Sequence, residues 1–305
     1  MRILQLIDNH DYVCTNSWQS QLAIGLDRLN LVRRVTLDDV KNGLNKHLIS
    51  ECDVVLSTIK FRNVMRDRDA IAKYLGGSPV YLYDQDPHEF HTDDSPYKGA
   101  YPLVTGALNV KKYFVTSKWW ADRLNDHGVP TSFVRMWPLP EHCVVGPVFA
   151  ARRNPLGFMG LMHPYRASLF AYLSSRGYEV PDLGRWPFNG FFERLLNVGI
   201  FVYSDQKTFL SDGEELPLGN GLWGKAVEVA SHGCFVIRNR GADWSSYLEK
   251  VKTTFLYDSV EEVPGIIDSI LSMDEDERKK LVIESVDHIR TCDYWSDVTV
   301  ALGAA

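Results

Sequence analysis

The residues best suited to chemistry lie close together in a glycine-rich stretch, GNGLWGKAVEVASHG, at positions 219–233. Gly219, Gly221 and Gly224 predict a tight turn, and a ligand can approach the backbone there because glycine has no side chain. A helix that starts from such a turn offers unpaired N–H groups and the positive end of its dipole to an anion. The turn therefore predicts a site for a phosphate-containing ligand.

Two charged residues follow this turn on a predicted helix at 225–232. Lys225 and Glu228 are three residues apart, so they share one helix face near its N-terminus. A lysine ammonium can neutralise phosphate, and a glutamate carboxylate can accept hydrogen bonds from paired hydroxyls such as those of a ribose. Together they indicate a nucleotide diphosphate site. An ordinary turn with a surface glutamate stays open at this point, because short motifs match by chance.

The order of residues in this stretch resembles the nucleotide-sugar site of GT-B glycosyltransferases, in particular the retaining group with an E-x7-E motif. The resemblance implies that Glu228, the second glutamate of the motif, binds the ribose of the donor. The first glutamate contacts the donor sugar in that group, and Asn220 replaces it here. The donor-binding residues that the resemblance implies are Arg166, Gly219, Asn220, Gly221, Leu222, Lys225 and Glu228.

Two further segments resemble the same family. The stretch FVTSKWWADRLNDHGVP at 114–130 resembles the GT-B segment in which a strand meets a serine, a helix follows and a Gly-Val-Pro turn leads to another strand. In that family the loop after the first strand of the second half carries a basic residue for the donor diphosphate. Arg166 is the best match, because a guanidinium can bridge two phosphate oxygens. Taken alone, an arginine on a helix surface is an equal alternative.

The sequence DQDPH at 84–88 follows a predicted strand and places Asp84 two residues before Asp86. In the GT-A glycosyltransferase fold, a D-x-D of this kind binds a metal ion and the donor diphosphate, and two carboxylates suit Mg²⁺ or Mn²⁺. A divalent metal at Asp84 and Asp86 is therefore the alternative. A GT-A chain has no place for a second parallel half with a donor-site turn, so we expect no metal.

On the GT-B interpretation the same loop faces the acceptor, and Asp84, Asp86 or His88 orients the acceptor hydroxyl. His10, in the loop after the first predicted strand, is a further candidate for a general base or a sugar contact. These four residues are the catalytic candidates. They could instead form caps and turns, because Asp-Pro favours turns.

The elements that must position these residues alternate between strand and helix, which predicts parallel, doubly wound sheets. Short apolar runs predict strands at 2–7, 53–59, 80–83, 113–116, 133–136, 156–161, 199–204, 234–237 and 255–257. We expect an α/β protein of the GT-B fold, with two Rossmann-like domains facing each other across a cleft. The expected domains are 1–145 on the acceptor side and 146–290 for the donor, with 291–305 packing back on the first.

Composition limits the class of protein. The 305 residues suit two domains, and 45% hydrophobic with 24% charged residues is typical of a globular chain. No apolar run is long enough to cross a membrane, and the first ten residues do not resemble a signal peptide. Five cysteines without a Cys-x-x-Cys spacing indicate reduced thiols and a cytoplasmic location. A net charge of −6 disfavours a protein that holds nucleic acid mainly through its phosphates.

The resemblance implies transfer of a sugar from a UDP- or GDP-sugar to an acceptor hydroxyl, with retention of configuration and without a metal. The acceptor stays open between a carbohydrate, another small molecule and a modified DNA base. One alternative is a phage-type glycosyltransferase that modifies hydroxymethylpyrimidines in DNA. Another is an inactive nucleotide-binding module of the same fold, suggested by Asn220.

Overall fold

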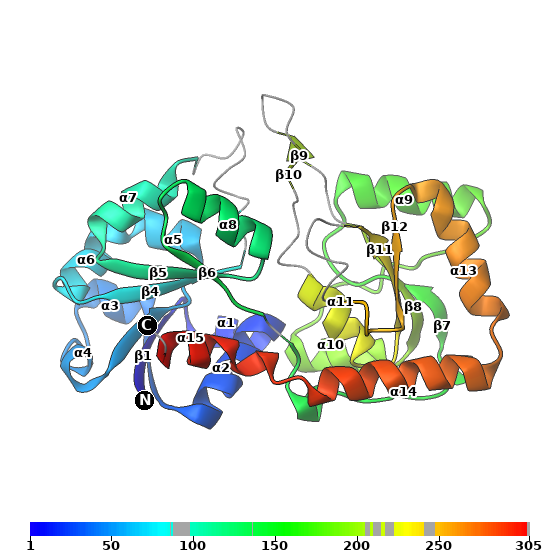
Figure 1. Ribbon diagram of the computed structural model, residues 1–305, viewed down its shortest axis with the longest axis horizontal. Helices are drawn as coiled ribbons and strands as arrows, with labels where there is room; N and C mark the ends of the chain where they lie inside the picture. The colour runs from blue at the N-terminus through cyan, green and yellow to red at the C-terminus, as the bar shows by residue number, and fades with distance from the viewer. Residues whose placement is uncertain are drawn as a thin grey trace. The chain divides into compact units, whose positions relative to one another are not determined.

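The computed structural model describes residues 1–85, 87, 98–135, 137–204, 208–209, 215–216, 223–240 and 248–303. The chain forms two compact units, shown in Figure 1. The first unit comprises Met1–Met136, Thr208–Leu216 and Tyr294–Ala305, and the second comprises Trp137–Lys207 and Pro217–Asp293. The chain therefore leaves the first unit near residue 136, returns to it for residues 208–216, and returns again at residue 294.

The first unit is built on a six-stranded sheet in the order β2-β1-β3-β4-β5-β6. All its neighbouring strands run parallel. The strand order changes direction between β1 and β3, and ligands bind at the carboxyl ends of the strands beside such a switch point. The strands are β1 Arg2–Ile7, β2 Leu31–Thr36, β3 Val54–Ser57, β4 Val80–Asp84, β5 Val110–Val115 and β6 Thr131–Phe133.

Helices cover both faces of this sheet because successive side chains of a strand point to opposite faces. Leu4 and Leu6 of β1 join one apolar cluster, whereas Ile3 joins another. The helices are α1 His10–Thr15, α2 Ser17–Leu29, α3 Leu37–Asn42, α4 Leu48–Glu51, α5 Phe61–Arg66, α6 Arg68–Leu75, α7 Ala100–Ala107 and α8 Lys118–Asp126. Both faces of the central strands are thus buried, as in other parallel sheets.

The C-terminal segment lies against α2 in the first unit, and Figure 1 shows α15 beside that helix. It consists of the 3-10 helix η6 Tyr294–Ser296 and α15 Asp297–Gly303. Val298 and Leu302 of α15 pack in the cluster that contains Trp18 of α2. The Arg135 guanidinium donates to both carboxylate oxygens of Asp297, at 2.7 and 3.1 Å. Apolar burial and an ion pair therefore hold this segment in place.

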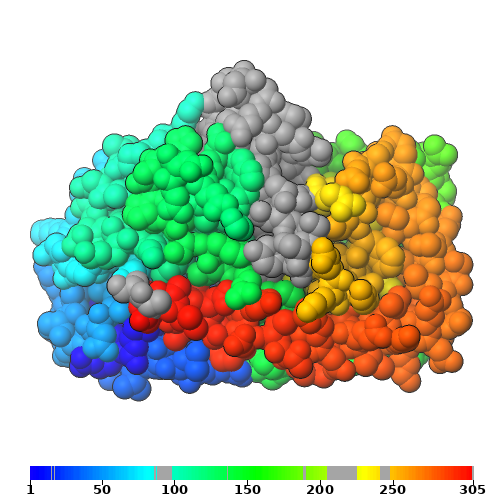
Figure 2. Space-filling model, in the orientation of Figure 1, coloured from blue at the N-terminus to red at the C-terminus, as the bar shows by residue number. Residues whose placement is uncertain are grey.

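The second unit contains a four-stranded parallel sheet in the order β12-β11-β8-β7. Its strands are β7 Asn154–Gly157, β8 Val198–Val202, β11 Phe235–Asn239 and β12 Thr254–Tyr257. Its helices are α9 Pro164–Ser175, α10 Phe188–Leu195, α11 Trp223–Ala230, α13 Val263–Ser272 and α14 Glu275–Thr291, with 3-10 helices η2 Pro140–His142, η3 Phe149–Ala151 and η5 Val260–Glu262. Figure 2 shows α13 and α14 at the surface of this unit. A two-stranded antiparallel pair, β9 Thr208–Phe209 and β10 Glu215–Leu216, completes the described strands.

Most predicted strands are observed within a few residues of their expected bounds, but the strand predicted at 133–136 is wrong. β6 ends at Phe133 because its partner β5 ends at Val115, which is paired with Phe133. The Val134 N–H still donates to the Val115 carbonyl oxygen at 2.9 Å, but the following N–H, that of Arg135, donates to the Asp297 carboxylate at 2.9 Å. The alternating parallel architecture expected from the sequence is confirmed in both units.

Candidate functional site

The glycine-rich stretch leads into α11 at the carboxyl edge of the second sheet. The predicted donor residues Gly219, Asn220, Gly221 and Leu222 lie outside the described residues, whereas Lys225 and Glu228 lie within them. Since α11 connects parallel strands β8 and β11, its N-terminus lies at the edge where β8 ends. This is the edge at which open α/β sheets bind their ligands.

Gly233 ends the turn that follows α11 and precedes β11. It has a φ of 70°, and a Cβ placed on it would lie 2.1 Å from the carbonyl oxygen of Val145. Only glycine fits a left-handed conformation with another backbone so close. This residue therefore fixes how α11 joins the sheet, and with it where the charged side chains of the helix lie.

Lys225 and Glu228 form an ion pair, which confirms the prediction that they share one helix face. The Lys225 ammonium lies 2.9 Å from a carboxylate oxygen of Glu228, whose side chain is 0% exposed. The same ammonium lies 3.9 Å from the centroid of the Phe191 ring. A buried carboxylate requires such a partner, because an unpaired buried charge strongly destabilises a fold. Lys225 therefore supplies a counter-charge to the buried Glu228 carboxylate on α11.

Arg166 lies at the same edge of the second sheet, on the first turn of α9. Its side chain is buried, and it donates to the carbonyl oxygens of Ser204 and Leu161 at 2.7 and 2.6 Å. Leu161 follows β7 and Ser204 follows β8, so the guanidinium ties together two loops at the carboxyl edge. The guanidinium carbon Cζ of Arg166 also lies 4.7 Å from the centroid of the Tyr203 ring. The sequence had suggested a diphosphate ligand here, and the observed partners are backbone carbonyls.

His232 supports the helix from its C-terminal side and was not expected to take part in the site. Its Nδ1 lies 3.0 Å from the carbonyl oxygen of Glu228, and its ring stacks on Phe192 with centroids 4.3 Å apart. Burial lowers the pKa of His232 to about 4, so the ring is neutral at pH 7. The imidazole therefore adds no charge beside the Lys225–Glu228 pair.

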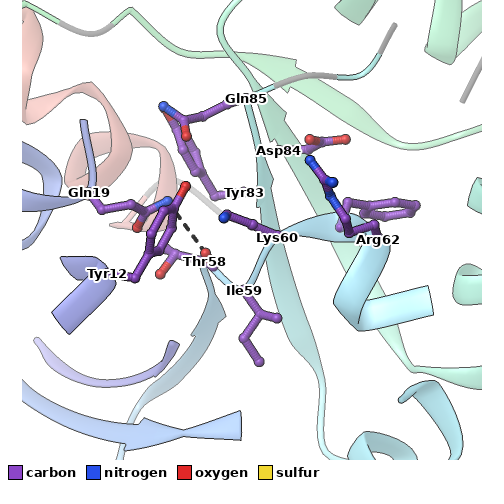
Figure 3. A pocket seen from close by; sticks show the side chains of 10 residues that line it. Tyr12, Gln19, Thr58, Ile59, Lys60, Arg62, Tyr83, Asp84 and Gln85 are labelled. Atoms are coloured by element: carbon purple, nitrogen blue, oxygen red, sulfur yellow. Dashed lines mark hydrogen bonds between the residues drawn. The ribbon is translucent and has the colours of Figure 1, made fainter. Parts of the chain in front are cut away.

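A polar pocket lies at the carboxyl edge of the first sheet, beside its switch point (Figure 3). It encloses about 420 Å³, part of which is open to solvent. The described residues that line it are Tyr12, Gln19, Thr58, Ile59, Lys60, Phe61, Arg62, Tyr83, Asp84 and Gln85. They come from the end of β4 and from the segments that follow β1, β3 and β4. In Figure 3 the side chains of Tyr12, Lys60 and Gln85 converge on the pocket.

Asp84 is the predicted acceptor-side residue that the structure places in this pocket. Its side chain is buried, and the hydroxyl of Tyr101 donates to its carboxylate at 2.5 Å. Figure 3 shows the Arg62 guanidinium pointing toward the same carboxylate. Asp84 is thus held as a fixed acceptor of hydrogen bonds. Asp86 and His88 lie outside the described residues.

His10 begins α1, one residue after the N-cap Asn9, whose side chain accepts from the backbone of Tyr12 at 2.7 Å. Its side chain is exposed. Tyr12 of the same helix lines the pocket, but His10 is not among the lining residues. The structure therefore does not bring His10 to the pocket that contains Asp84.

Sequence reasoning missed Lys60 and Arg62, the two cations among the described residues that line the pocket. The backbone N–H of Lys60 donates to Asp8 at 2.9 Å, and the side chain of Asn63 donates to the same carboxylate at 2.6 Å. The Lys60 ammonium lies 4.0 Å from the centroid of the Tyr12 ring. The available signal was a basic pair, Lys-Phe-Arg at 60–62, directly after a buried strand.

The described part of the chain shows neither a metal-binding cluster nor a membrane-spanning helix. No group of three or more His, Cys, Asp or Glu side chains there could hold a metal ion. Asp86, half of the expected D-x-D, is outside that part. No helix among the described residues combines the length and the apolar character needed to cross a bilayer.

Solved structures share this architecture over the whole chain. HepE from Anabaena, solved with UDP and glucose, is 11% identical with a TM-score of 0.67, and the match covers 100% of both chains. Sucrose-phosphate synthase from Thermosynechococcus elongatus is 11% identical with a TM-score of 0.63, covering 100% of this chain and 98% of that one. An α,α-trehalose-phosphate synthase from Burkholderia vietnamiensis is 12% identical with a TM-score of 0.56, covering 100% of both.

Sequence comparison adds no relative: no protein-family model matches the chain, and no curated protein matches it significantly. At 11–12% identity the solved structures establish the fold of the chain. The expected GT-B fold is thereby confirmed, with a Rossmann-like sheet in each unit.

Proposed function

We propose that the protein is a glycosyltransferase that moves a sugar from a nucleotide diphosphate donor, a UDP- or GDP-sugar, to an acceptor hydroxyl. The observation that carries this proposal is the fully buried, ion-paired Glu228 on α11. A fixed carboxylate at the ligand-binding edge suits the two hydroxyls of a ribose. Structures of the same fold that contain UDP or UDP-glucose support a nucleotide-sugar donor.

The donor would bind the second unit, with its ribose on Glu228 and its phosphates beside the turn at 219–222. Lys225 would serve mainly to orient Glu228, because its ammonium already donates to that carboxylate. Arg166 would shape the phosphate side by holding the loops after β7 and β8. Fixed dipoles and cations at this edge would stabilise the departing diphosphate, so we expect transfer without a metal.

In the transfer the acceptor oxygen bonds the anomeric carbon, and the bond from that carbon to the diphosphate breaks. The hydroxyl proton leaves with the diphosphate or passes to a base on the acceptor side. We assign the acceptor to the pocket of the first unit, with Asp84 orienting its hydroxyl. Asp86 and His88 remain candidates for the base, and retention of configuration remains an expectation from the resemblance. The five cysteines are free, in keeping with the expected cytoplasmic location.

Calorimetric titration of the full-length protein with UDP and GDP tests the donor site. We expect one nucleotide to bind, and Glu228→Gln to weaken it by about tenfold or more, since hydrogen bonds to a charged group contribute roughly 1.5–3 kcal/mol. Glu284→Gln, a change of an exposed glutamate on α14, is the matched control and should bind normally. Equal affinity in wild type and Glu228→Gln would overturn the assignment.

Asn220 keeps one alternative in view, an inactive nucleotide-binding module, because it replaces the residue that contacts the donor sugar in the resembled group. Mass spectrometry after incubation with a panel of nucleotide sugars decides between the two. Release of the nucleotide or transfer of the sugar supports the enzyme. Nucleotide binding without either product supports the module.

A further inference from the structure

The pocket of the first unit contains a cation whose charge no carboxylate of the described residues balances. Two cations, Lys60 and Arg62, and one carboxylate, Asp84, line it. In Figure 3 Arg62 points toward Asp84, whereas Lys60 points to the other side of the pocket. Within the described ranges no ion pair involves the Lys60 ammonium, which lies over the Tyr12 ring.

The position of Lys60 is fixed by its backbone and its stem. Asp8, at the end of β1, accepts from the Lys60 N–H at 2.9 Å and from the Asn63 side chain at 2.6 Å. Both oxygens of this carboxylate are thus committed to holding the turn before α5. The Tyr12 ring then holds the ammonium at the pocket, 4.0 Å from the ring centroid, by a cation–π contact. The cation is in place before any ligand binds.

Gln19 supplies an independent sign of a polar ligand. Its side chain is 3% exposed and lines the pocket. The amide nitrogen makes a long bond of 3.4 Å to the carbonyl oxygen of Thr58, and the amide oxygen is buried without a hydrogen-bond partner. Buried polar atoms rarely stay unpaired in folded proteins. A small movement of the amide would let a hydroxyl of a ligand satisfy this oxygen.

We propose that this pocket binds its ligand through an anionic group, a phosphate or carboxylate placed on the Lys60 ammonium, while hydroxyls of the same molecule meet Gln19 and Asp84. The ligand is then an acidic polyol such as a sugar phosphate or a sugar acid. That it is the acceptor of a sugar rests on the proposed function. A neutral sugar would leave the Lys60 ammonium without a counter-charge in the pocket, whereas an ammonium binds phosphate well as a point charge.

Calorimetry on the full-length protein without any nucleotide tests this proposal, using glucose 6-phosphate, glucuronate and glucose as probes. We expect at least one charged probe to bind about tenfold more tightly than glucose, because a hydrogen bond to a charged group is stronger than a neutral one. The phosphate and the carboxylate probe distinguish the two anions. Binding should weaken as salt rises, since the ammonium is exposed.

Variants of Lys60 test whether this residue causes the preference for charged probes. Lys60→Gln should lower the affinity for the charged probe about tenfold and leave that for glucose unchanged, and Lys60→Arg should keep most of it. Lys111→Gln, a change of an exposed lysine on β5, is the matched control. Equal binding of charged and neutral probes, no binding of either charged probe at millimolar concentration, or an unaffected Lys60→Gln would overturn the proposal. The proposal would also be overturned if duplex DNA bound to the protein through Lys60 while the small anions did not bind.

These titrations contain no nucleotide, so their result is separate from that of the UDP and GDP titrations. Loss of the donor assignment would leave an anion site in the first unit intact. Loss of the anion site would leave a glycosyltransferase that uses a neutral acceptor.

Discussion

Lys225 and Glu228 differ in exposure, and this difference decides what each can do. The Glu228 side chain is fully buried, whereas 22% of the Lys225 side chain is exposed. Three-residue spacing on a helix predicted that they share a face, and the ion pair confirms it. Burial of the carboxylate could not be predicted, because it depends on the elements that cover α11.

Lys225→Met should therefore destabilise the second unit by about 3 kcal/mol, because it leaves an unpaired buried carboxylate. The double variant Lys225→Met with Glu228→Gln should recover most of this loss, since no charge is then buried. Urea unfolding of the two variants and the wild type measures both effects. A single variant as stable as wild type would show that Glu228 does not depend on this partner.

His232 makes the free energy of unfolding depend on pH between 6.5 and about 4. Its pKa is lowered from 6.5 to about 4 by burial, so the unfolded chain takes up a proton before the folded one does. Its contribution is fully present above pH 6.5 and is lost as the pH falls toward 4, by about 3 kcal/mol at most. Unfolding at several pH values should show this slope. His232→Gln should remove the part of the pH dependence that His232 contributes. An unchanged slope in this variant would contradict the assignment.

Lys60 and Arg62 show the limit of prediction at this scale. Both residues are recognisable in the sequence as cations, and they directly follow the strand predicted at 53–59. Their function depends on β1, β3 and β4 ending side by side, which brings Tyr12 and Asp84 to them. A tertiary arrangement of three strands is not visible in one stretch of residues.

At the scale of elements, apolar runs identified the buried strands, and β2 was the strand of the two parallel sheets that sequence reasoning missed. β2 is Leu-Val-Arg-Arg-Val-Thr and lies at the edge of the sheet. Arg34 is accommodated because its guanidinium donates to Gln5 and Asp27, at 2.9 and 3.0 Å. An edge strand tolerates such charged residues. They obscure the alternation of apolar and polar residues by which a strand is recognised.

A substitution of Gly233 tests whether the connection between α11 and β11 depends on a glycine at this position. Gly233→Ala should destabilise the second unit by about 3 kcal/mol or more, because a φ of 70° disfavours alanine and its Cβ would lie 2.1 Å from the Val145 carbonyl oxygen. Gly265→Ala, in the first turn of α13 and with open space around the added Cβ, is the control. It should gain about 0.5–1 kcal/mol, since alanine favours helix. Thermal unfolding compares the two, and equal effects would contradict this account of Gly233.

At the scale of the whole molecule, the chain returns to its first unit at the end. Removing residues 294–305 should destabilise that unit by about 3–5 kcal/mol, because Val298 and Leu302 leave the cluster around Trp18 and the Arg135–Asp297 pair is lost. Hydrogen exchange in α2 should rise in the truncated protein. Exchange in α2 equal to that of the full chain would show that the segment is not needed there.

The two-unit fold could be predicted from alternating strands and helices and from the donor-site motif, and solved structures of the same architecture confirm it. The substrates could not be predicted to the same degree. They depend on a few polar side chains in pockets, such as Gln19 and Lys60, whose positions follow from the packing of distant segments.

The central claim is that α11 and the turn before it bind the nucleotide of an activated sugar. Hydrogen exchange measured by mass spectrometry with and without UDP or GDP tests it most directly. We predict that the nucleotide slows exchange in peptides that cover α11 and that Glu228→Gln abolishes this protection. Nucleotide binding that protects other segments and leaves α11 unchanged would contradict the account.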